Sequence, residues 1–118
     1  QDLKKGIWLL YSEGTTDIGH CSSQYLNKKT VVWNFYIGEK NFSPGSGIRM
    51  LVFFIKKLFY EEGISKIESK IIDENYKSKR IHKELGFKLY SSNQNIENYA
   101  LTKKKFNDRF FNVERNEN

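Results

Sequence analysis

The stretch that decides the fold is Asn41-Phe42-Ser43-Pro44-Gly45-Ser46-Gly47-Ile48-Arg49-Met50, in which two glycines separated by one residue join a strand-like segment to an amphipathic helix. Residues 30–37 before it are rich in β-branched and aromatic side chains, and apolar residues after it recur at helical spacing. The first N–H groups of a helix have no partner within it, and glycine lets an anion approach the backbone closely. The stretch therefore predicts an anion site made of backbone amides, although an ordinary strand-to-helix turn explains a lone Gly-x-Gly at least as well.

Length and composition predict one small globular domain. The chain has 118 residues, of which 38% are hydrophobic and 15% aromatic, enough for a single core. The longest apolar run, residues 50–55, is far shorter than a membrane span, and no charged-then-apolar leader opens the sequence. The single Cys21 cannot form an internal disulfide, which favours a reducing compartment. We therefore expect a cytoplasmic protein that does not bind a membrane.

The charge favours an anionic partner without selecting one. Twenty Lys and Arg residues against fourteen Asp and Glu residues give a formal net charge of +6. Nucleic acid is the first candidate on charge alone, but the lysines are spread along the chain without a recognisable nucleic-acid-binding motif. A phosphate-rich small ligand fits as well, so no nucleic-acid partner is expected. A basic composition without functional meaning is the competing interpretation.

The order of elements predicts an α/β (α+β) fold. Three strands form an antiparallel meander, and a strand-helix-strand unit with parallel, right-handed pairing follows it. Gly63 and Gly86 end the two helices. We expect a folded domain at residues 1–102 and a charged tail at 103–118 that forms a partial helix or is disordered. The predicted elements are strands 6–12, 17–25 and 30–37, helix 46–62, strand 65–72, a helix ending at 85, and strands 87–90 and 99–102.

Four separate segments, taken in order, resemble the Gcn5-related N-acetyltransferases, the GNAT superfamily. They are Phe35-Tyr36-Ile37 at a strand end, the Gly45-x-Gly47 turn, the Asp73-x-Asn75 strand exit, and Leu85-Gly86-Phe87 at a helix end. The most specific is residues 75–87, which are similar to the family segment Asn-x-x-Ala-x-x-x-Tyr-x-x-x-Gly-Phe. Each segment alone is a weak signal, and the four in this order are a strong one.

The resemblance implies that acetyl-CoA is the cosubstrate and that no metal is needed. It also implies that the strands at 30–37 and 65–72 splay apart, so that the strand edge pairs with the amides of the pantetheine arm. Asn75 is also a good helix N-cap and could serve both purposes. The implied cofactor-binding residues are Phe35, Tyr36 and Ile37 for pantetheine, Gly45, Ser46, Gly47 and Ile48 for the pyrophosphate, Arg49 as an additional charge, and Asn75 for pantetheine.

Two positions depart from the family pattern. Phe42 stands where the family usually has Arg or Gln, which removes one polar contact to the cofactor. His82 stands where the family has a Tyr that protonates the departing CoA thiolate, so the resemblance makes His82 the general acid. An unperturbed imidazole titrates near 6.5 and is roughly one-quarter protonated at pH 7. A surface histidine on an amphipathic helix is the alternative. The resemblance also assigns the Tyr36 N–H to the acetyl carbonyl oxygen.

The general base remains open. Some relatives carry a Glu on the central strand, but residues 31–34 offer no carboxylate here. Solvent, His20, Glu39 or a residue outside this sequence could take the proton of the amine. His20 beside Cys21 also suggests a metal ligand pair or a Cys-His nucleophile, but neighbours on a strand point to opposite faces, which disfavours both.

Within the superfamily, residues 32–41 and 99–104 most resemble bacterial sugar-nucleotide amine acetyltransferases, those of pseudaminic-acid biosynthesis in particular. This resemblance implies a small amine acceptor such as a UDP-linked amino sugar. The match begins at the family's second strand, so we expect the first strand and two helices to be missing, or another subunit, as in a homodimer, to complete the site. The alternatives are acetylation of ribosomal-protein or other protein amines, and a non-catalytic basic module that binds CoA or nucleic acid.

Overall fold

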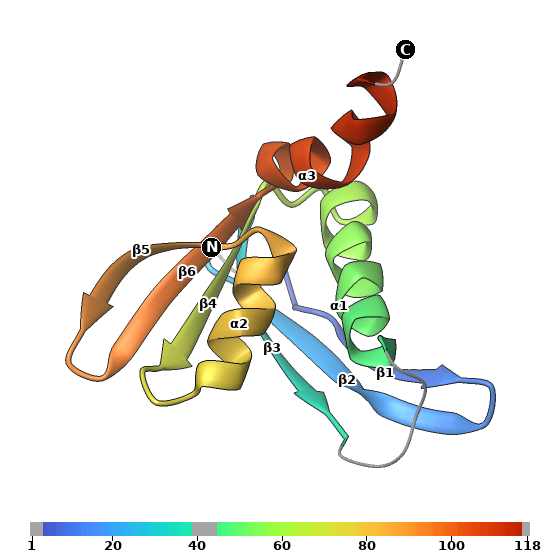
Figure 1. The fold of residues 1–118 in the computed structure, drawn as a ribbon, viewed down its shortest axis with the longest axis horizontal. Coiled ribbons are helices and arrows are strands. Elements are labelled where there is room, and N and C mark those ends of the chain that lie inside the picture. The colour runs from blue at the N-terminus through green and yellow to red at the C-terminus, as the bar shows by residue number, and fades with distance from the viewer. Residues whose placement is uncertain (1–3, 39–44, 117–118) are drawn as a thin grey trace. The chain divides into compact units, whose positions relative to one another are not determined.

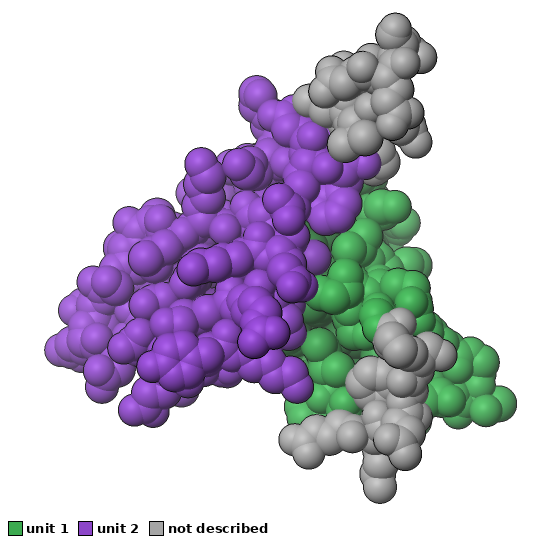
Figure 2. Space-filling view, in the orientation of Figure 1, with its two compact units in different colours: residues 1–64 green, residues 65–118 purple. Residues whose placement is uncertain are grey.

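The computed structural model describes residues 4–38 and 45–116, without the side chains of residues 111–116. It divides the chain into two compact units, Gln1–Ile64 and Ser65–Asn118 (Figure 2). Each unit contains three neighbouring antiparallel strands and at least one helix, which makes both of them mixed α and β structures. Within the described ranges, no helix is long and apolar enough to span a bilayer.

The strands of unit 1 form the predicted antiparallel meander. They are β1 (Trp8–Glu13), β2 (Thr16–Tyr25) and β3 (Thr30–Ile37), and β2 pairs with both neighbours (Figure 1). The register between β1 and β2 shifts between Tyr11 and Ser12, which is the mark of a β-bulge. The pairing of β2 with β3 keeps one register from end to end, so the backbone direction of each β3 residue follows from it.

The helix of unit 1 is α1 (Ser46–Lys56), which continues as the π-helix η1 (Lys57–Glu61). Its apolar side chains are buried, and Phe54 stacks on Trp33 of β3 with ring centroids 6.5 Å apart. Gly63 ends the helix as predicted, because its φ of +72° suits glycine and the next N–H, from Ile64, donates to the Leu58 carbonyl at 3.0 Å. The sequence predicted the length of this helix but not its π-helical last turn.

Unit 2 places its last strand in the middle. The strands are β4 (Lys66–Ile72), β5 (Lys88–Asn93) and β6 (Ile96–Thr102), in the order β4-β6-β5. The hairpin is longer than predicted, since the turn at Gln94 replaces the expected loop at 91–94. All six residues of β5 are exposed, so no hydrophobic alternation marked its second half.

Two helices complete unit 2, namely α2 (Tyr76–Leu85) and α3 (Lys103–Asn116). Gly86 ends α2 in the left-handed conformation, as predicted. The segment after residue 102 forms a helix, which decides between the two alternatives for the tail, and Phe106 anchors it because its side chain is fully buried. The predicted parallel pairing and splay of residues 30–37 and 65–72 concern both units and stay predictions, as does a domain boundary at residue 102.

Candidate functional site

The glycine turn leads directly into the N-terminus of α1. Gly45 has a φ of +84°, a left-handed conformation that side chains rarely adopt, and it provides no side-chain cap. The first backbone bond of the helix runs from the Arg49 N–H to the Gly45 carbonyl at 2.9 Å. A Cβ on Gly47 would lie 2.9 Å from Cδ1 of Ile37, so glycine allows the helix to start close to the end of β3. The amides of residues 46–48 therefore stand at a helix N-terminus, where backbone donors bind phosphate.

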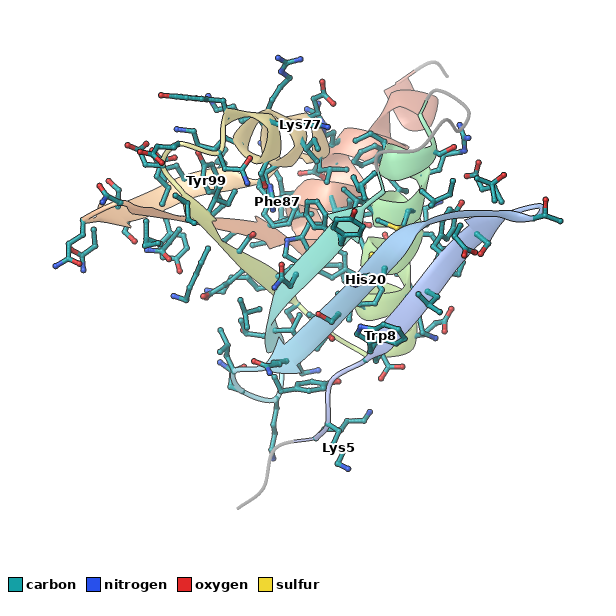
Figure 3. All side chains as sticks on the ribbon, turned by 90° about the horizontal axis from the view of Figure 1, so that it is seen from below. Lys5, Trp8, His20, Lys77, Phe87 and Tyr99 are labelled. Atoms are coloured by element: carbon teal, nitrogen blue, oxygen red, sulfur yellow. The ribbon has the colours of Figure 1, made fainter. Side chains whose placement is uncertain are left out.

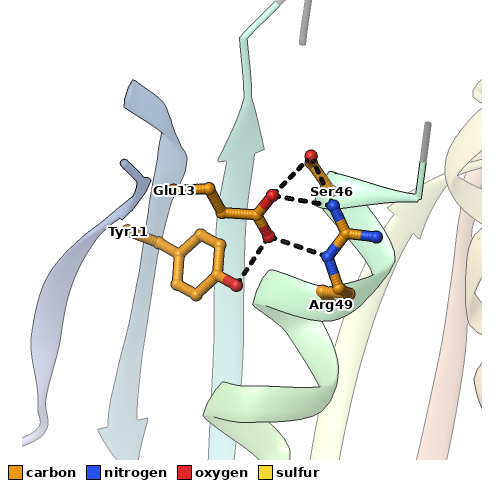
Figure 4. A network of polar contacts seen from close by, with 4 residues as sticks. All are labelled: Tyr11, Glu13, Ser46 and Arg49. Atoms are coloured by element: carbon orange, nitrogen blue, oxygen red, sulfur yellow. Dashed lines mark hydrogen bonds and ion pairs between the residues drawn. The ribbon is translucent and has the colours of Figure 1, made fainter. Parts of the chain in front are cut away.

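A polar network holds this turn in place (Figure 4). The carboxylate of Glu13 accepts two hydrogen bonds from Arg49, at 2.9 Å from Nε and 2.7 Å from Nη2. It also accepts one from the buried Ser46 hydroxyl at 2.9 Å and one from the Tyr11 hydroxyl at 2.8 Å. These bonds, those of Arg49 first, lower the pKa of Glu13 to about 2. The network is therefore fully charged at neutral pH.

The network changes the interpretation of Arg49. The sequence suggested this side chain as an additional charge for a pyrophosphate, but the structure pairs it with Glu13. No sequence pattern marked Tyr11 or Glu13 as part of the site. Glu13 lies 36 residues before Arg49, in a segment expected to be a turn, and no local pattern links the two.

The register of β3 decides which backbone groups face away from β2. Gly38 donates to the Ile18 carbonyl at 2.8 Å, and hydrogen-bonded pairs alternate along an antiparallel ladder. Tyr36, opposite His20, therefore belongs to a hydrogen-bonded pair and directs its N–H and C=O to β2. This corrects the backbone roles predicted for Tyr36, both toward pantetheine and toward the acetyl oxygen. The outward-facing groups are those of Phe35 and Ile37, as the sequence predicted for these two residues.

One of the outward groups already has a partner. The Phe35 N–H donates to the side-chain oxygen of the preceding residue, Asn34, at 3.0 Å. Asn34 itself is exposed, so its amide can rotate away at little cost. Sequence analysis did not single out Asn34, because no motif marks it.

The side chains of His20 and Cys21 point to opposite faces of β2, as strand geometry predicts. The ring of His20 contacts those of Trp8 and Tyr36, with both centroid distances 5.6 Å. Figure 3 shows His20 beside Trp8. Cys21 is fully buried, and burial raises the pKa of its thiol to about 12. No group of three His, Cys, Asp or Glu residues in the described ranges could hold a metal. A Cys-His nucleophile therefore has no support, while Phe42 and the candidate base Glu39 lie outside the described residues.

Asn75 caps α2. Its side-chain oxygen accepts the Ser78 N–H at 3.1 Å, which is the N-cap arrangement predicted as one of its two uses. Asn75 is exposed, and this hydrogen bond uses only the oxygen of its amide, so the amide nitrogen can still donate to a ligand. The cap and the predicted contact to pantetheine are therefore compatible.

His82 is a core residue of unit 2. Only 1% of it is exposed, and its ring packs edge-on against Phe87, with centroids 4.8 Å apart. Its Nδ1 lies 2.7 Å from the Ser78 carbonyl, so the neutral ring carries its proton on Nδ1 and donates it there. Burial lowers the pKa of His82 to about 4. His82 is therefore not an unperturbed imidazole, so the one-quarter protonation given for one does not apply to it, and the alternative of a surface histidine was wrong.

Comparison with known proteins identifies the family. The family model described as an acetyltransferase (GNAT) domain matches residues 5–110, so the chain belongs to the GNAT acetyltransferases. No curated protein matches the chain. The match confirms the predicted fold class and the predicted class of enzyme, an acetyl-CoA-dependent N-acetyltransferase.

Several solved structures share the fold. The N-acetyltransferase PseH of Campylobacter jejuni in complex with acetyl coenzyme A is 15% identical with a TM-score of 0.75, and the match covers 84% of this chain and 69% of that one. The nucleotide-linked sugar GNAT FdhC is 16% identical with a TM-score of 0.80, over 94% of this chain and 65% of that one. A mutant of the spermidine N-acetyltransferase SpeG from Vibrio cholerae is 14% identical with a TM-score of 0.77, over 88% and 69%. The chain thus spans about two thirds of the length of these proteins.

Proposed function

We propose that this domain transfers the acetyl group of acetyl-CoA to the primary amine of a small acceptor that carries phosphate, such as a nucleotide-linked amino sugar. The observation that carries the proposal is the glycine turn at the start of α1, inside a chain that belongs to the GNAT family. Backbone amides at a helix N-terminus favour a pyrophosphate, and acetyl-CoA contains one. Two solved structures with this fold, PseH and FdhC, support an acceptor of the sugar class.

We infer the contacts to acetyl-CoA for each unit by itself. In unit 1, the amides of Gly45, Ser46, Gly47 and Ile48 hold the pyrophosphate, and the outward-facing backbone of Phe35 and Ile37 pairs with pantetheine. Arg49 stays with Glu13 and holds the turn in place. In unit 2, the side-chain nitrogen of Asn75 donates to the pantetheine arm.

The chemical step is a direct attack. The nitrogen lone pair of the neutral amine forms a bond to the thioester carbon, the C–S bond breaks, and the sulfur leaves as a thiolate. The attacking nitrogen loses one proton to a base and the thiolate gains one from an acid, so the step is balanced. An outward N–H of β3, from Phe35 or Ile37, is the donor that this register offers to the developing oxyanion.

His82 remains the proposed proton donor, under a stricter condition. With a pKa of about 4, roughly one ring in a thousand is protonated at pH 7. A thiolate formed next to the ring would raise this pKa, since an opposite charge favours the protonated imidazole. The role therefore requires the leaving sulfur to come close to His82. His82→Phe is expected to lower turnover more than acetyl-CoA affinity, and equal turnover where chemistry limits the rate would remove the assignment.

A polyamine is the main competing acceptor, because the SpeG structure shares this fold. The net charge of +6 argues against it, since a basic protein attracts anions and repels polycations. Protein amines and a non-catalytic basic module remain further alternatives. Neither has an observation in its favour beyond charge.

Release of free thiol from acetyl-CoA tests the proposal. The panel of acceptors contains UDP-linked amino sugars, spermidine and a lysine peptide. Turnover with the first group alone is expected. Turnover with spermidine alone or with the peptide alone would show that the acceptor is a polyamine or a protein amine instead. If CoA protects the protein against heat but no acceptor releases thiol, a non-catalytic CoA-binding module is favoured.

A further inference from the structure

Unit 2 contains a pocket beside α2 to which the proposed function assigns no contact. Its volume is about 480 Å³, within the range of small-ligand sites. Two lining residues come from α2, one from the loop before β5, two from the start of β5 and two from β6. The lining consists of Lys79, Lys83, Phe87, Lys88, Leu89, Glu97 and Tyr99.

The three lysines of this pocket differ in whether they form ion pairs within the protein. Lys79 forms ion pairs with Asp73 at 3.2 Å and with Glu97 at 3.5 Å. Lys83 and Lys88 form no ion pair with any described residue, and both are exposed. The pocket therefore presents two ammonium groups that are available to an anion.

The single carboxylate of the lining is satisfied within the protein. Glu97 accepts a hydrogen bond from the Tyr99 hydroxyl at 2.6 Å and pairs with Lys79. Burial, together with this bond, raises the pKa of Tyr99 to about 12, so its hydroxyl stays protonated and keeps donating. With three lysines against one carboxylate, the lining carries a positive balance.

An apolar surface lies next to these ammonium groups. Phe87 and Tyr99, labelled in Figure 3, are almost fully buried. Their ring centroids lie 4.8 and 6.0 Å from that of His82, whereas Leu89 is 50% exposed. The pocket is much larger than an inorganic ion, which leaves room for a group attached to the anion. Lysine is a common phosphate ligand that acts as a point charge, and the apolar surface accepts a ring or a chain.

We propose that this pocket binds the phosphate of a phosphate ester, with the organic part of the ester on Leu89 and its apolar neighbours. This inference rests on the proposed function in one respect, namely that both substrates of that reaction, acetyl-CoA and the amine acceptor, carry phosphate. The phosphate belongs either to the acceptor or to the ribose of CoA. The chemistry of recognition is the same for both.

Binding measurements on two double variants test the pocket. Lys83→Gln with Lys88→Gln removes both available ammonium groups, and Lys77→Gln with Arg80→Gln removes the same charge from exposed positions of α2 outside the lining. Calorimetry at low salt measures the Kd of UDP, of acetyl-CoA and of CoA without its 3′-phosphate. The pocket variant is expected to bind at least one phosphate ester roughly tenfold more weakly, and the control variant less than about twofold.

The pattern of losses identifies the source of the phosphate. A loss for UDP alone assigns the pocket to the acceptor, and a loss for acetyl-CoA that disappears without the 3′-phosphate assigns it to CoA. Equal losses in both double variants, or no loss in either, would overturn the proposal. Because these are binding measurements, an inactive domain that still shows the loss would refute the proposed function and leave the pocket standing.

Discussion

The two anion sites that we propose, one in each unit, differ in the donors they offer. At the start of α1 in unit 1, the donors are backbone amides, and the charged side chains nearby pair with one another. In the pocket of unit 2, the donors are the side chains of Lys83 and Lys88 on an apolar base. Anion binding at the first site depends on the backbone conformation of the turn, which glycine permits. Anion binding at the second depends on charged side chains, so its affinity depends on salt.

Each unit contains a titratable group with a lowered pKa, and the physical causes of the two shifts differ. Glu13 is charged and surrounded by donors, so its pKa is lowered to about 2. His82 is neutral and buried, and its pKa is lowered to about 4. Hydrogen bonding to the charged form causes the first shift, and loss of water causes the second.

The largest expected effect is a loss of folding stability at low pH, which arises from His82 in unit 2. Unfolded His82 titrates near 6.5, so its contribution to stability is complete above that pH and is lost as pH falls toward 4. The difference corresponds to about 3 kcal/mol. Chemical denaturation measures the free energy of unfolding at pH 7 and at pH 4. The wild type should lose more of it between these pH values than His82→Phe does. Parallel profiles for the two proteins would show that the imidazole is not held neutral by burial.

A smaller effect is expected at the glycine turn. Gly45→Asp places a carboxylate at the proposed pyrophosphate site and should weaken acetyl-CoA binding about 50-fold, since like charges brought together cost several kcal/mol. Gly63→Asp is the matched control, because Gly63, beyond the other end of the helix, also has a positive φ and a Cβ there meets open space. Calorimetry measures both. An equal loss of affinity in the control would assign the effect to backbone strain.

The edge of β3 should respond in the opposite direction. Asn34→Ala removes the side-chain oxygen that competes with a ligand for the Phe35 N–H. Acetyl-CoA binding is expected to tighten about fivefold, the value of one hydrogen bond. Asn98→Ala on β6 serves as the control. Weaker binding of the Asn34 variant would mean that Asn34 contacts the cofactor itself.

The smallest effect concerns Glu13. Glu13→Gln removes one negative charge beside the proposed pyrophosphate site and should tighten acetyl-CoA binding about threefold at low salt. Glu62→Gln makes the same change of charge at the other end of the helix and should have no effect. A large loss of affinity in the Glu13 variant would show that the intact network with Arg49 is needed to shape the turn.

Much of the fold was predictable because it follows from local signals. The meander, the helix that starts after Gly45 and ends at Gly63, and the helix between Asn75 and Gly86 all appear close to their expected positions. Caps, turns and hydrophobic periodicity act within a few residues, so the order of residues specifies them. The extended hairpin of β5 and β6 was missed in part because an exposed strand has no apolar alternation.

The candidate site was less predictable, because three of its features depend on residues far apart in the chain. The register between β2 and β3 directs the backbone groups of Tyr36 toward β2. Burial keeps His82 neutral, and Arg49 forms an ion pair with Glu13. The sequence by itself determined the glycine turn, the helix ends and the family, since these are patterns of neighbours. Only the tertiary structure decided which amides face outward and which side chains lose water, because pairing and burial are properties of segments that meet after folding.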